Sequence, residues 1–273
     1  ILMKTDLTIK DLINLTHDVL LKIIGKDISV ARLDGNPNFI CLFNNYELVK
    51  AKKKYISKNL SFHEIGIPDL YKFHGLSEII NSYNAELRKN ITCTYIGTGP
   101  RSTNMLLSDN DEYFQHITEI HNFLTDKGYE VNFKLHHSRL SSIKNLNEIS
   151  NKKINLINDD EFVHSLQLSK FSIIEPSSAS LAPAIIGMPI VLSKVLKLSN
   201  LKFGQLFNEY PRSFEIYSFN ELSIFLDELE QGSFKLKKID EWLAKSLGPM
   251  PLDDLPKRVA KVLIQASHKT NNN

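Results

Sequence analysis

In the last two-thirds of the chain, short apolar runs rich in β-branched residues alternate with helical segments, and this alternation constrains the fold most. The runs that we predict as strands occupy residues 91–96, 131–135, 154–157, 171–174 and 190–192, with a sixth at 214–217. Helices are expected between them at 113–127, 161–167 and 181–186. Strands that alternate with helices form βαβ units. The sequence therefore predicts an α/β fold with a parallel sheet.

The flanking regions extend this pattern less clearly. Before the sheet we expect a helix at 9–24, a strand at 28–31, a basic helix at 46–57 and a strand at 60–65. Residues 70–90 are predicted to be a connector, and three helices are expected after the sheet at 221–229, 239–247 and 255–266. A chain of 273 residues has room for two small domains. We expect one domain over 1–88, including a linker, and a second over 89–273, including the terminal helices.

Composition excludes several classes of protein. The chain is 42% hydrophobic and 23% charged, which is typical of globular proteins. A net charge of +2 does not indicate a nucleic-acid partner. Cys41 and Cys93 are too few for a disulfide framework. No apolar stretch reaches the roughly 20 residues that span a bilayer, and no signal peptide precedes them. We therefore expect a cytoplasmic protein.

A basic run offers one alternative to a purely soluble location. It consists of Lys50, Lys52, Lys53 and Lys54, in the helix expected at 46–57. We predict that it forms a solvated helix face. The alternative is peripheral contact with the anionic inner face of a membrane.

Three loops after predicted strands carry side chains suited to a nucleotide. Ligands of open α/β sheets bind beyond the carboxyl ends of the strands. The first loop contains Gly97, Gly99 and Arg101. Glycine lets a backbone approach a ligand closely, and arginine can bind a phosphate through two parallel hydrogen bonds. The alternative is an ordinary strand-to-helix turn with a surface arginine.

The second loop begins with His136 and His137, directly after the strand at 131–135. A histidine there can donate to a phosphate or act as a general acid or base near neutral pH. A metal site is not expected, because the other histidines show no matching ligand spacing. The alternative is one core-facing and one solvated histidine.

The third loop runs from Glu175 through Ser177, Ser178 and Ser180 into a predicted helix. Serines at a helix start offer hydroxyls and free backbone N–H groups to an anion. Glu175 can accept hydrogen bonds from the hydroxyls of a ribose or from a base. Simple capping of the helix is the alternative, but capping needs only one serine. This loop is the strongest of the three signals.

The residues 177–192 resemble the donor-binding domain of GT-B glycosyltransferases. In that family, small residues lead into a helix, which is followed by Gly-x-Pro and an apolar strand; here the Gly-x-Pro is Gly187-Met188-Pro189. His136 is similar in placement to the strand-end histidine of bacterial surface-polysaccharide transferases, which include sialyl-, Kdo- and polyol-phosphate transferases. The resemblance covers about residues 60–220. It implies two Rossmann-like domains, the second of which holds the donor nucleotide.

The resemblance also implies roles for single residues. His136, Ser177 and Ser178 would contact the donor phosphate, and Glu175 would lie near its ribose or base. Many GT-B enzymes carry a ribose-binding glutamate where this chain has Ala182, which favours a CMP-activated donor over a UDP-sugar. The family usually works without a bound metal or another cofactor, so none is expected here.

The resemblance leaves the first part of the chain short. About 90 residues are few for an N-terminal acceptor domain, so we expect that domain to be shortened or incomplete. Asp34 and His74 are the candidates for its catalytic base. The leading hypothesis is sugar transfer from a nucleotide-sugar to a surface-polysaccharide or glycolipid acceptor. A nucleotide-sugar hydrolase or epimerase, and a non-catalytic GT-B-like binding subunit, are the alternatives.

Overall fold

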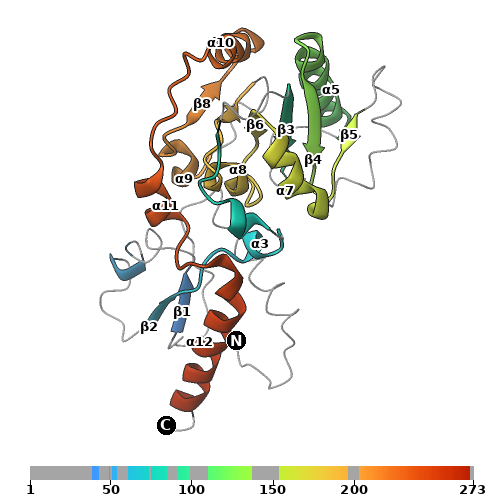
Figure 1. Ribbon diagram of the computed structural model, residues 1–273. Helices are drawn as coiled ribbons and strands as arrows, with labels where there is room; N and C mark the ends of the chain where they lie inside the picture. Colours follow the sequence, from blue (N-terminus) through green and yellow to red (C-terminus); the bar gives the residue numbers. More distant parts are fainter. Residues whose placement is uncertain are drawn as a thin grey trace. The chain divides into compact units, whose positions relative to one another are not determined.

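A computed structural model describes most of the chain after residue 60 (Figure 1). The described residues are 39–42, 49, 51–53, 61–73, 75–84, 91–98, 110–136, 154–195 and 203–270. Contacts divide the chain into two compact units. One unit comprises Ile1–Lys72 together with Asp240–Asn273, and the other comprises Phe73–Ile239.

The larger unit is built on a six-stranded parallel sheet. Its strands are β3 (Thr92–Ile96), β4 (Glu130–Lys134), β5 (Asn155–Leu156), β6 (Phe171–Ile174), β7 (Ile190–Ser193) and β8 (Ser213–Ile216). They lie in the order β5-β4-β3-β6-β7-β8, and every pair is parallel. Counted within the sheet, this is the order 3-2-1-4-5-6 of doubly wound Rossmann folds. The α/β class and the parallel sheet expected from the sequence are confirmed.

Helices cover both faces of this sheet (Figure 1). One face packs against α5 (Asn110–Asp126) and α10 (Phe219–Glu230) through a core rich in aromatic side chains. Within that core Phe171 contacts Phe225 of α10 with their ring centroids 5.3 Å apart. On the other face, Thr94 Oγ1 lies 2.8 Å from both Ser165 Oγ and Ser169 Oγ, at α7 (Asp159–Leu168). Side chains of a strand alternate between faces, so β3 contributes to both layers.

The ends of the helices follow from local sequence. Asn158 caps α7: its side chain accepts from the backbone N–H groups of Asp160 and Glu161, at 2.8 and 3.0 Å. The Glu161 side chain in return accepts from the Asn158 N–H, which completes a capping box. The helix α5 is followed by Gly128 in a left-handed conformation with φ of 86°. Glycine adopts this conformation without steric cost, and the chain turns there into β4.

Residues 73–84 pack against the six-stranded unit instead of forming only a connector. Their 3-10 helix η1 spans Leu76–Ile79. The Asn81 and Tyr83 N–H groups donate to Ile185 O and Ile186 O, at 3.0 and 2.8 Å. The Tyr83 hydroxyl donates to Lys170 O at 2.7 Å. These residues close the carboxyl end of α8 (Leu181–Ile185).

The other unit contains a small parallel sheet and the terminal helices. Its elements are β1 (Phe39–Leu42), β2 (Ser61–Glu64), α3 (Pro68–Tyr71), α11 (Asp240–Ser246), η5 (Leu252–Asp254) and α12 (Leu255–Thr270). Arg258 of α12 joins them, because its Nε donates to Ile65 O and its Nη1 to Pro251 O, both at 2.9 Å. The sequence did not predict β1 or the short α9 (Gln205–Asn208). The strand expected at 28–31 lies outside the described residues.

Across the described part of the chain, no helix is both long enough and apolar enough to cross a membrane.

Candidate functional site

The strand order places a topological switch point between β3 and β6. β3 pairs with β4 on one side and with β6 on the other, so the connections after β3 and β6 leave in opposite directions. Ligands of open α/β sheets bind outside the carboxyl ends of the strands at such a point. Gly97 and Thr98 follow β3 there, and Glu175 follows β6. Two of the three loops singled out in the sequence therefore begin side by side at this edge.

Glu175 is completely buried at the switch point. Its Oε1 accepts a hydrogen bond from the Tyr95 hydroxyl. Its Oε2 accepts from the Thr98 N–H at 2.7 Å and from the Tyr113 hydroxyl at 3.3 Å. The Thr98 hydroxyl in turn donates to Pro176 O at 2.8 Å. The carboxylate therefore joins the turn after β3 to the turn after β6, and its predicted contact with a ribose or base remains a prediction.

Gly97 is required by close packing. A Cβ at this position would lie 2.5 Å from the Tyr113 hydroxyl oxygen and 2.9 Å from Leu135 Cδ2. Both distances are shorter than real Cβ contacts, and Tyr113 and Leu135 are buried. The absence of a side chain at Gly97 leaves the space in which the Tyr113 hydroxyl reaches Glu175. This packing requirement is separate from the ligand approach that the sequence suggested.

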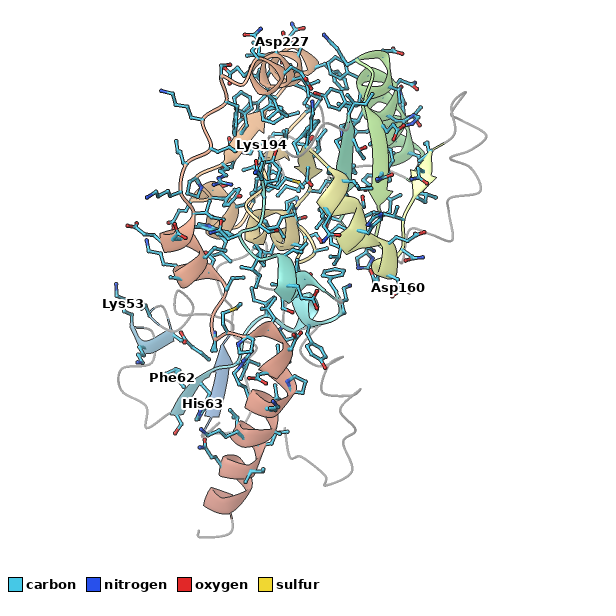
Figure 2. The ribbon with its side chains drawn as sticks, viewed as in Figure 1. Lys53, Phe62, His63, Asp160, Lys194 and Asp227 are labelled. Atoms are coloured by element: carbon cyan, nitrogen blue, oxygen red, sulfur yellow. The ribbon has the colours of Figure 1, made fainter. Side chains whose placement is uncertain are left out.

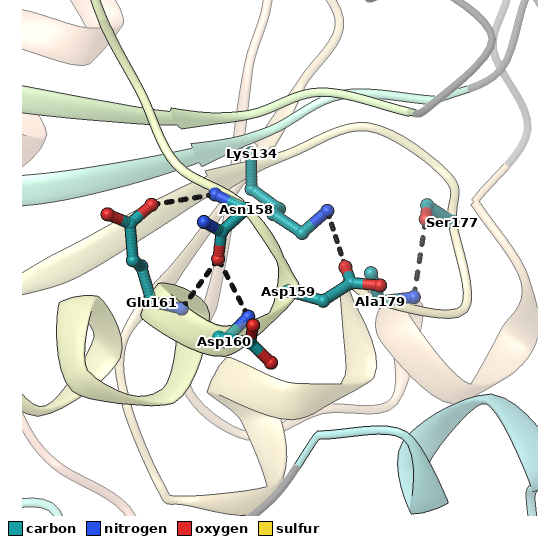
Figure 3. Close-up of polar contacts among 7 residues, drawn as sticks. All are labelled: Lys134, Asn158, Asp159, Asp160, Glu161, Ser177 and Ala179. Carbon is teal, nitrogen blue, oxygen red and sulfur yellow. Dashed lines mark hydrogen bonds and ion pairs between the residues drawn. The ribbon is translucent and has the colours of Figure 1, made fainter.

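The serine-rich turn after β6 is partly accessible. Ser177 and Ser178 are half-buried, whereas Ser180 is buried and donates from its hydroxyl to Glu175 O at 2.7 Å. The Ser177 hydroxyl accepts from the Ala179 N–H at 3.2 Å (Figure 3). The helix α8 that follows has no acidic residue in its first turn. An anion near this turn would meet no carboxylate from that helix.

The neighbouring helix α7 begins in the opposite electrostatic setting (Figure 3). Its first turn carries Asp159, Asp160 and Glu161 in addition to the Asn158 cap. Carboxylates there complement the positive end of the helix dipole. Lys134, the last residue of β4, forms an ion pair with Asp159 at 2.7 Å. The start of α7 is therefore already neutralised, and the serine turn is the better position for a ligand anion.

The structure describes His136 and leaves several other predicted residues outside the described ranges. His136 lies two residues after the end of β4 and is half-buried. Since β4 and β6 flank β3, their ends are about 10 Å apart at ordinary strand spacing. The predicted residues outside the described part of the chain are Asp34, His74, Gly99, Arg101 and His137. No group of His, Cys, Asp or Glu side chains within the described ranges is arranged to hold a metal ion.

A further polar cluster lies at the carboxyl ends of β7 and β8 (Figure 2, Lys194). Lys194 Nζ forms an ion pair with Glu215 Oε2 at 2.8 Å. The Tyr217 hydroxyl donates to the same Oε2 at 2.7 Å. The hydrogen bond from Lys194 holds the pKa of the Glu215 carboxyl below its ordinary value. Glu215 therefore stays ionised at neutral pH and balances the lysine charge.

Sequence reasoning missed the residues that hold the site together. Tyr95, Thr98, Tyr113 and Lys134 were not singled out, although all four lie at or near the carboxyl edge. A signal for two of them was available, because Tyr95 and Lys134 are polar side chains in strands that are otherwise suited to burial. Their partners are 25 to 80 positions away in the chain, so only the folded sheet reveals the pairing.

Comparison with known proteins identifies the fold. No protein family and no curated protein sequence matches the chain. Among solved structures, the chain is similar to the UDP-GlcNAc 2-epimerase of Methanocaldococcus jannaschii in complex with UDP-GlcNAc and UDP, with a TM-score of 0.53 and 11% identity. It is also similar to a variant of the wall teichoic acid polymerase TagF, with a TM-score of 0.56 and 15% identity.

These matches extend over most of this chain. They cover 84% of it for the epimerase and 92% for TagF, but only 61% and 67% of those two chains. Both neighbours are GT-B fold proteins. At these identities the likeness is one of fold, and it agrees with the Rossmann order of the six-stranded sheet. The chain therefore has a Rossmann-like α/β fold whose structural neighbours are GT-B proteins.

Proposed function

We propose that this protein is a GT-B-type glycosyltransferase that moves a sugar from a nucleotide-sugar donor to a surface-polysaccharide or glycolipid acceptor. The observation that carries the proposal is the switch point between β3 and β6, with a half-buried serine turn beside it. That position is where open α/β sheets bind nucleotides. The GT-B fold of the neighbours supports the same reading.

The proposed chemistry places positive and hydrogen-bonding groups around the donor phosphate. Arg101, His136 and the backbone after Ser177 would bind the phosphate, with Ser178 beside them. As the sugar departs, negative charge grows on the leaving phosphate, and preorganised donors that stabilise this charge lower the barrier. Gly97, Gly99, His137, Glu175 and Ser180 complete the proposed donor site. No metal or other cofactor takes part in this proposal.

The acceptor side of the proposal rests on the first part of the chain. The proposed acceptor domain comprises residues 1–88 with a linker at its end, and that linker includes the segment that packs on the six-stranded unit. The proposed donor domain comprises residues 89–273, of which 240–273 group with the first unit. Asp34 or His74 would be the base that activates the acceptor hydroxyl. A cytoplasmic location is proposed. Contact with the inner membrane face through the exposed Lys52 and Lys53 is the alternative to a fully solvated helix.

A CMP-sugar is the proposed donor, because Ala182 stands where many UDP-sugar enzymes carry a glutamate. Ala182 lies in α8 and is completely buried. Its side chain is a methyl group, which has no atom that could hydrogen-bond to a ribose. Isothermal calorimetry with CMP, CDP, UDP and GDP tests this directly. We expect CMP to bind most tightly. Tighter binding of UDP would contradict the donor assignment, and no heat with any nucleotide would contradict the proposed function and favour a binding subunit.

Two substitutions localise the nucleotide. His136→Ala and Ser177→Ala should each weaken binding about tenfold or more, because a hydrogen bond to a charged group contributes roughly 1.5–3 kcal/mol. Ser213→Ala is the matched control, since Ser213 begins β8 at the opposite, amino edge of the sheet. Its hydroxyl donates to Tyr210 O, and its loss should leave nucleotide binding unchanged.

The similarity to a UDP-GlcNAc 2-epimerase suggests UDP-GlcNAc as the substrate with which to test the epimerase or hydrolase alternative. The protein would be incubated with UDP-GlcNAc without an acceptor. Inversion at C2, or release of free sugar, would favour the epimerase or hydrolase alternative. Turnover that requires an added glycan or glycolipid acceptor would support sugar transfer.

A further inference from the structure

We propose that Glu175 is a positioning residue that holds the two turns of the donor site in place, and that it does not itself contact the ribose or base. This inference rests on the proposed function, because it assigns a task within the donor site. It replaces a direct ligand contact with an action through Thr98, Pro176 and Ser180. The carboxylate is buried, and both of its oxygens already accept hydrogen bonds from the protein.

Burial and hydrogen bonding exclude Glu175 from direct contact in this structure. The residue has no exposed surface. Its Oε1 accepts from the Tyr95 hydroxyl, and its Oε2 accepts from the Thr98 N–H at 2.7 Å and the Tyr113 hydroxyl at 3.3 Å. A buried carboxylate is costly unless hydrogen-bond donors surround it. These three donors come from β3, from the turn after it and from the first turn of α5.

Two of these donors, Thr98 and Tyr113, flank residues 99–109. Thr98 is the last described residue before this segment, and Tyr113 lies in the first turn of α5 after it. Both bind Oε2 of one side chain. The two positions at which the chain leaves the sheet and returns to α5 are therefore held to a common point.

The main chain around Glu175 ties the second turn to the same point. The Thr98 hydroxyl donates to Pro176 O at 2.8 Å, and the Ser180 hydroxyl donates to Glu175 O at 2.7 Å. The turn after β3 thus binds the turn after β6 twice, through the carboxylate and through Pro176. Ser177 and Ser178 lie between these two attachments. Their position relative to Thr98 is consequently set by Glu175 and its neighbours.

The lack of a side chain at Gly97 leaves room for one of the three donors to this carboxylate. A Cβ on Gly97 would overlap the Tyr113 hydroxyl, so a side chain there would push away one of the donors. Loss of the carboxylate would leave the Tyr95 and Tyr113 hydroxyls and the Thr98 N–H without their buried acceptor. Binding groups must be held within about 0.5 Å of the productive geometry. A loosened turn therefore weakens a ligand that never touches Glu175.

A pair of matched tyrosine variants tests the proposal in the full chain. Tyr95→Phe removes the hydroxyl that donates to Glu175 Oε1 at the switch point. Tyr129→Phe removes a comparable tyrosine–glutamate hydrogen bond, to Glu230, just before β4 at the amino edge of the same sheet. Glu175→Gln is the third variant, because an amide has only one accepting oxygen and cannot accept from the Tyr95 hydroxyl and the Thr98 N–H at the same time. Thermal midpoints identify how much each variant loses in overall stability.

Two readouts separate positioning from general destabilisation. Amide hydrogen exchange is measured for Thr98 and for peptides covering 175–180, and nucleotide affinity is measured by calorimetry with CMP. We expect faster exchange at both turns and about tenfold weaker binding for Tyr95→Phe and Glu175→Gln, as for loss of a roughly 1.4 kcal/mol interaction. Tyr129→Phe should change neither readout, even if its thermal midpoint falls equally.

Wild-type exchange and affinity in Tyr95→Phe and Glu175→Gln would overturn the proposal, and so would equal changes in Tyr129→Phe. A wild-type protein that binds no nucleotide would contradict the proposed function. The exchange measurement would still decide whether Glu175 holds the turns, because it needs no ligand.

Discussion

At the residue scale, two residues at the carboxyl edge of the sheet that the sequence predicts as ligand contacts have packing and hydrogen-bonding tasks in the structure. The sequence predicts Gly97 and Glu175 as ligand contacts, and the structure gives each of them a structural task. Glycine there admits the Tyr113 hydroxyl, and the carboxylate accepts from Tyr113 and Thr98. The half-buried Ser177 and His136 remain the residues with surface to offer a donor phosphate.

Gly97→Ala should destabilise the protein. The new methyl group would overlap the buried Tyr113 and Leu135 side chains, and overpacking of this kind costs about 1–3 kcal/mol. Urea unfolding should show the midpoint falling by a corresponding amount. Gly204→Ala is the control, because no atom lies within 4 Å of a Cβ built at that position. Equal midpoints for Gly97→Ala and the wild type would contradict the packing argument.

His116 should make the stability of the protein depend on pH. Burial lowers the pKa of this α5 histidine to about 4 from its ordinary 6.5, and neither ring nitrogen has a hydrogen-bond partner in the structure. The unfolded chain therefore binds more protons between these two values, and stability falls as the pH drops from 6.5 towards 4. At pH 5, the lowered pKa of His116 reduces the free energy of unfolding by about 2 kcal/mol.

The variant His116→Leu tests this linkage. Its free energy of unfolding, relative to wild type, should rise by about 2 kcal/mol when the pH is lowered from 7 to 5, because the variant has no imidazole to protonate. His164→Gln is the control, since His164 is exposed on α7. A relative stability of His116→Leu that stays constant with pH would show that His116 does not titrate in this range.

At the element scale, helix ends decide how the carboxyl edge is charged. The helix α7 begins with three carboxylates and an asparagine cap, whereas α8 begins without an acidic residue. Both helices follow strands of the same sheet, yet their first turns favour opposite ligands. The short serine turn, and not the better-formed helix α7, is therefore the position suited to a phosphate.

Asn158→Ala should cost about 1 kcal/mol, because the variant leaves the Asp160 and Glu161 N–H groups without their acceptor. Chemical unfolding monitored by circular dichroism measures the loss. Asn158→Asp should retain most of the stability, since its carboxylate accepts the same two bonds. If the alanine and aspartate variants were equally stable, the cap would contribute nothing to the helix.

At the scale of the whole molecule, the two compact units do not follow a single cut in the chain. The residues up to 72 group with those from 240 onwards, and residues 73–239 form the six-stranded unit. The segment at 73–84 belongs to that unit through Phe73, whose ring centroid lies 4.7 Å from that of Phe162. The backbone hydrogen bonds of Asn81 and Tyr83 also attach it to the unit.

A fragment of residues 73–239 should fold cooperatively, because it contains the complete parallel sheet and its aromatic core. A fragment of residues 89–239 should be less stable by about 3–5 kcal/mol, since it loses the buried Phe73 ring and the hydrogen bonds of Tyr83. Thermal unfolding of the two purified fragments provides the comparison. Equal stability would show that residues 73–84 contribute little to the unit.

The sequence by itself determined the strands of the six-stranded sheet, most of the helices in the described part of the chain and the fold class. All six predicted strands of the sheet are present, and each lies within about a residue or two of its expected bounds. Continuous apolar runs and amphipathic periods are local properties, so they can be read without knowing the partners of each element. The sequence does not predict β1, because a run of four apolar residues without alternation is too short to distinguish a strand from other buried segments.

Only the tertiary structure decided the strand order and the pairing at the carboxyl edge. Strand order depends on which runs pair, and pairing joins residues such as Cys93 and Phe171 that are far apart in sequence. The same is true of Glu175, whose donors Tyr95 and Thr98 lie nearly 80 positions away. The sequence predicts which loops could hold a ligand, because ligands of open α/β sheets bind beyond the carboxyl ends of the strands. It did not show which of their side chains are buried, since burial is a property of the assembled sheet and of the helices that cover it.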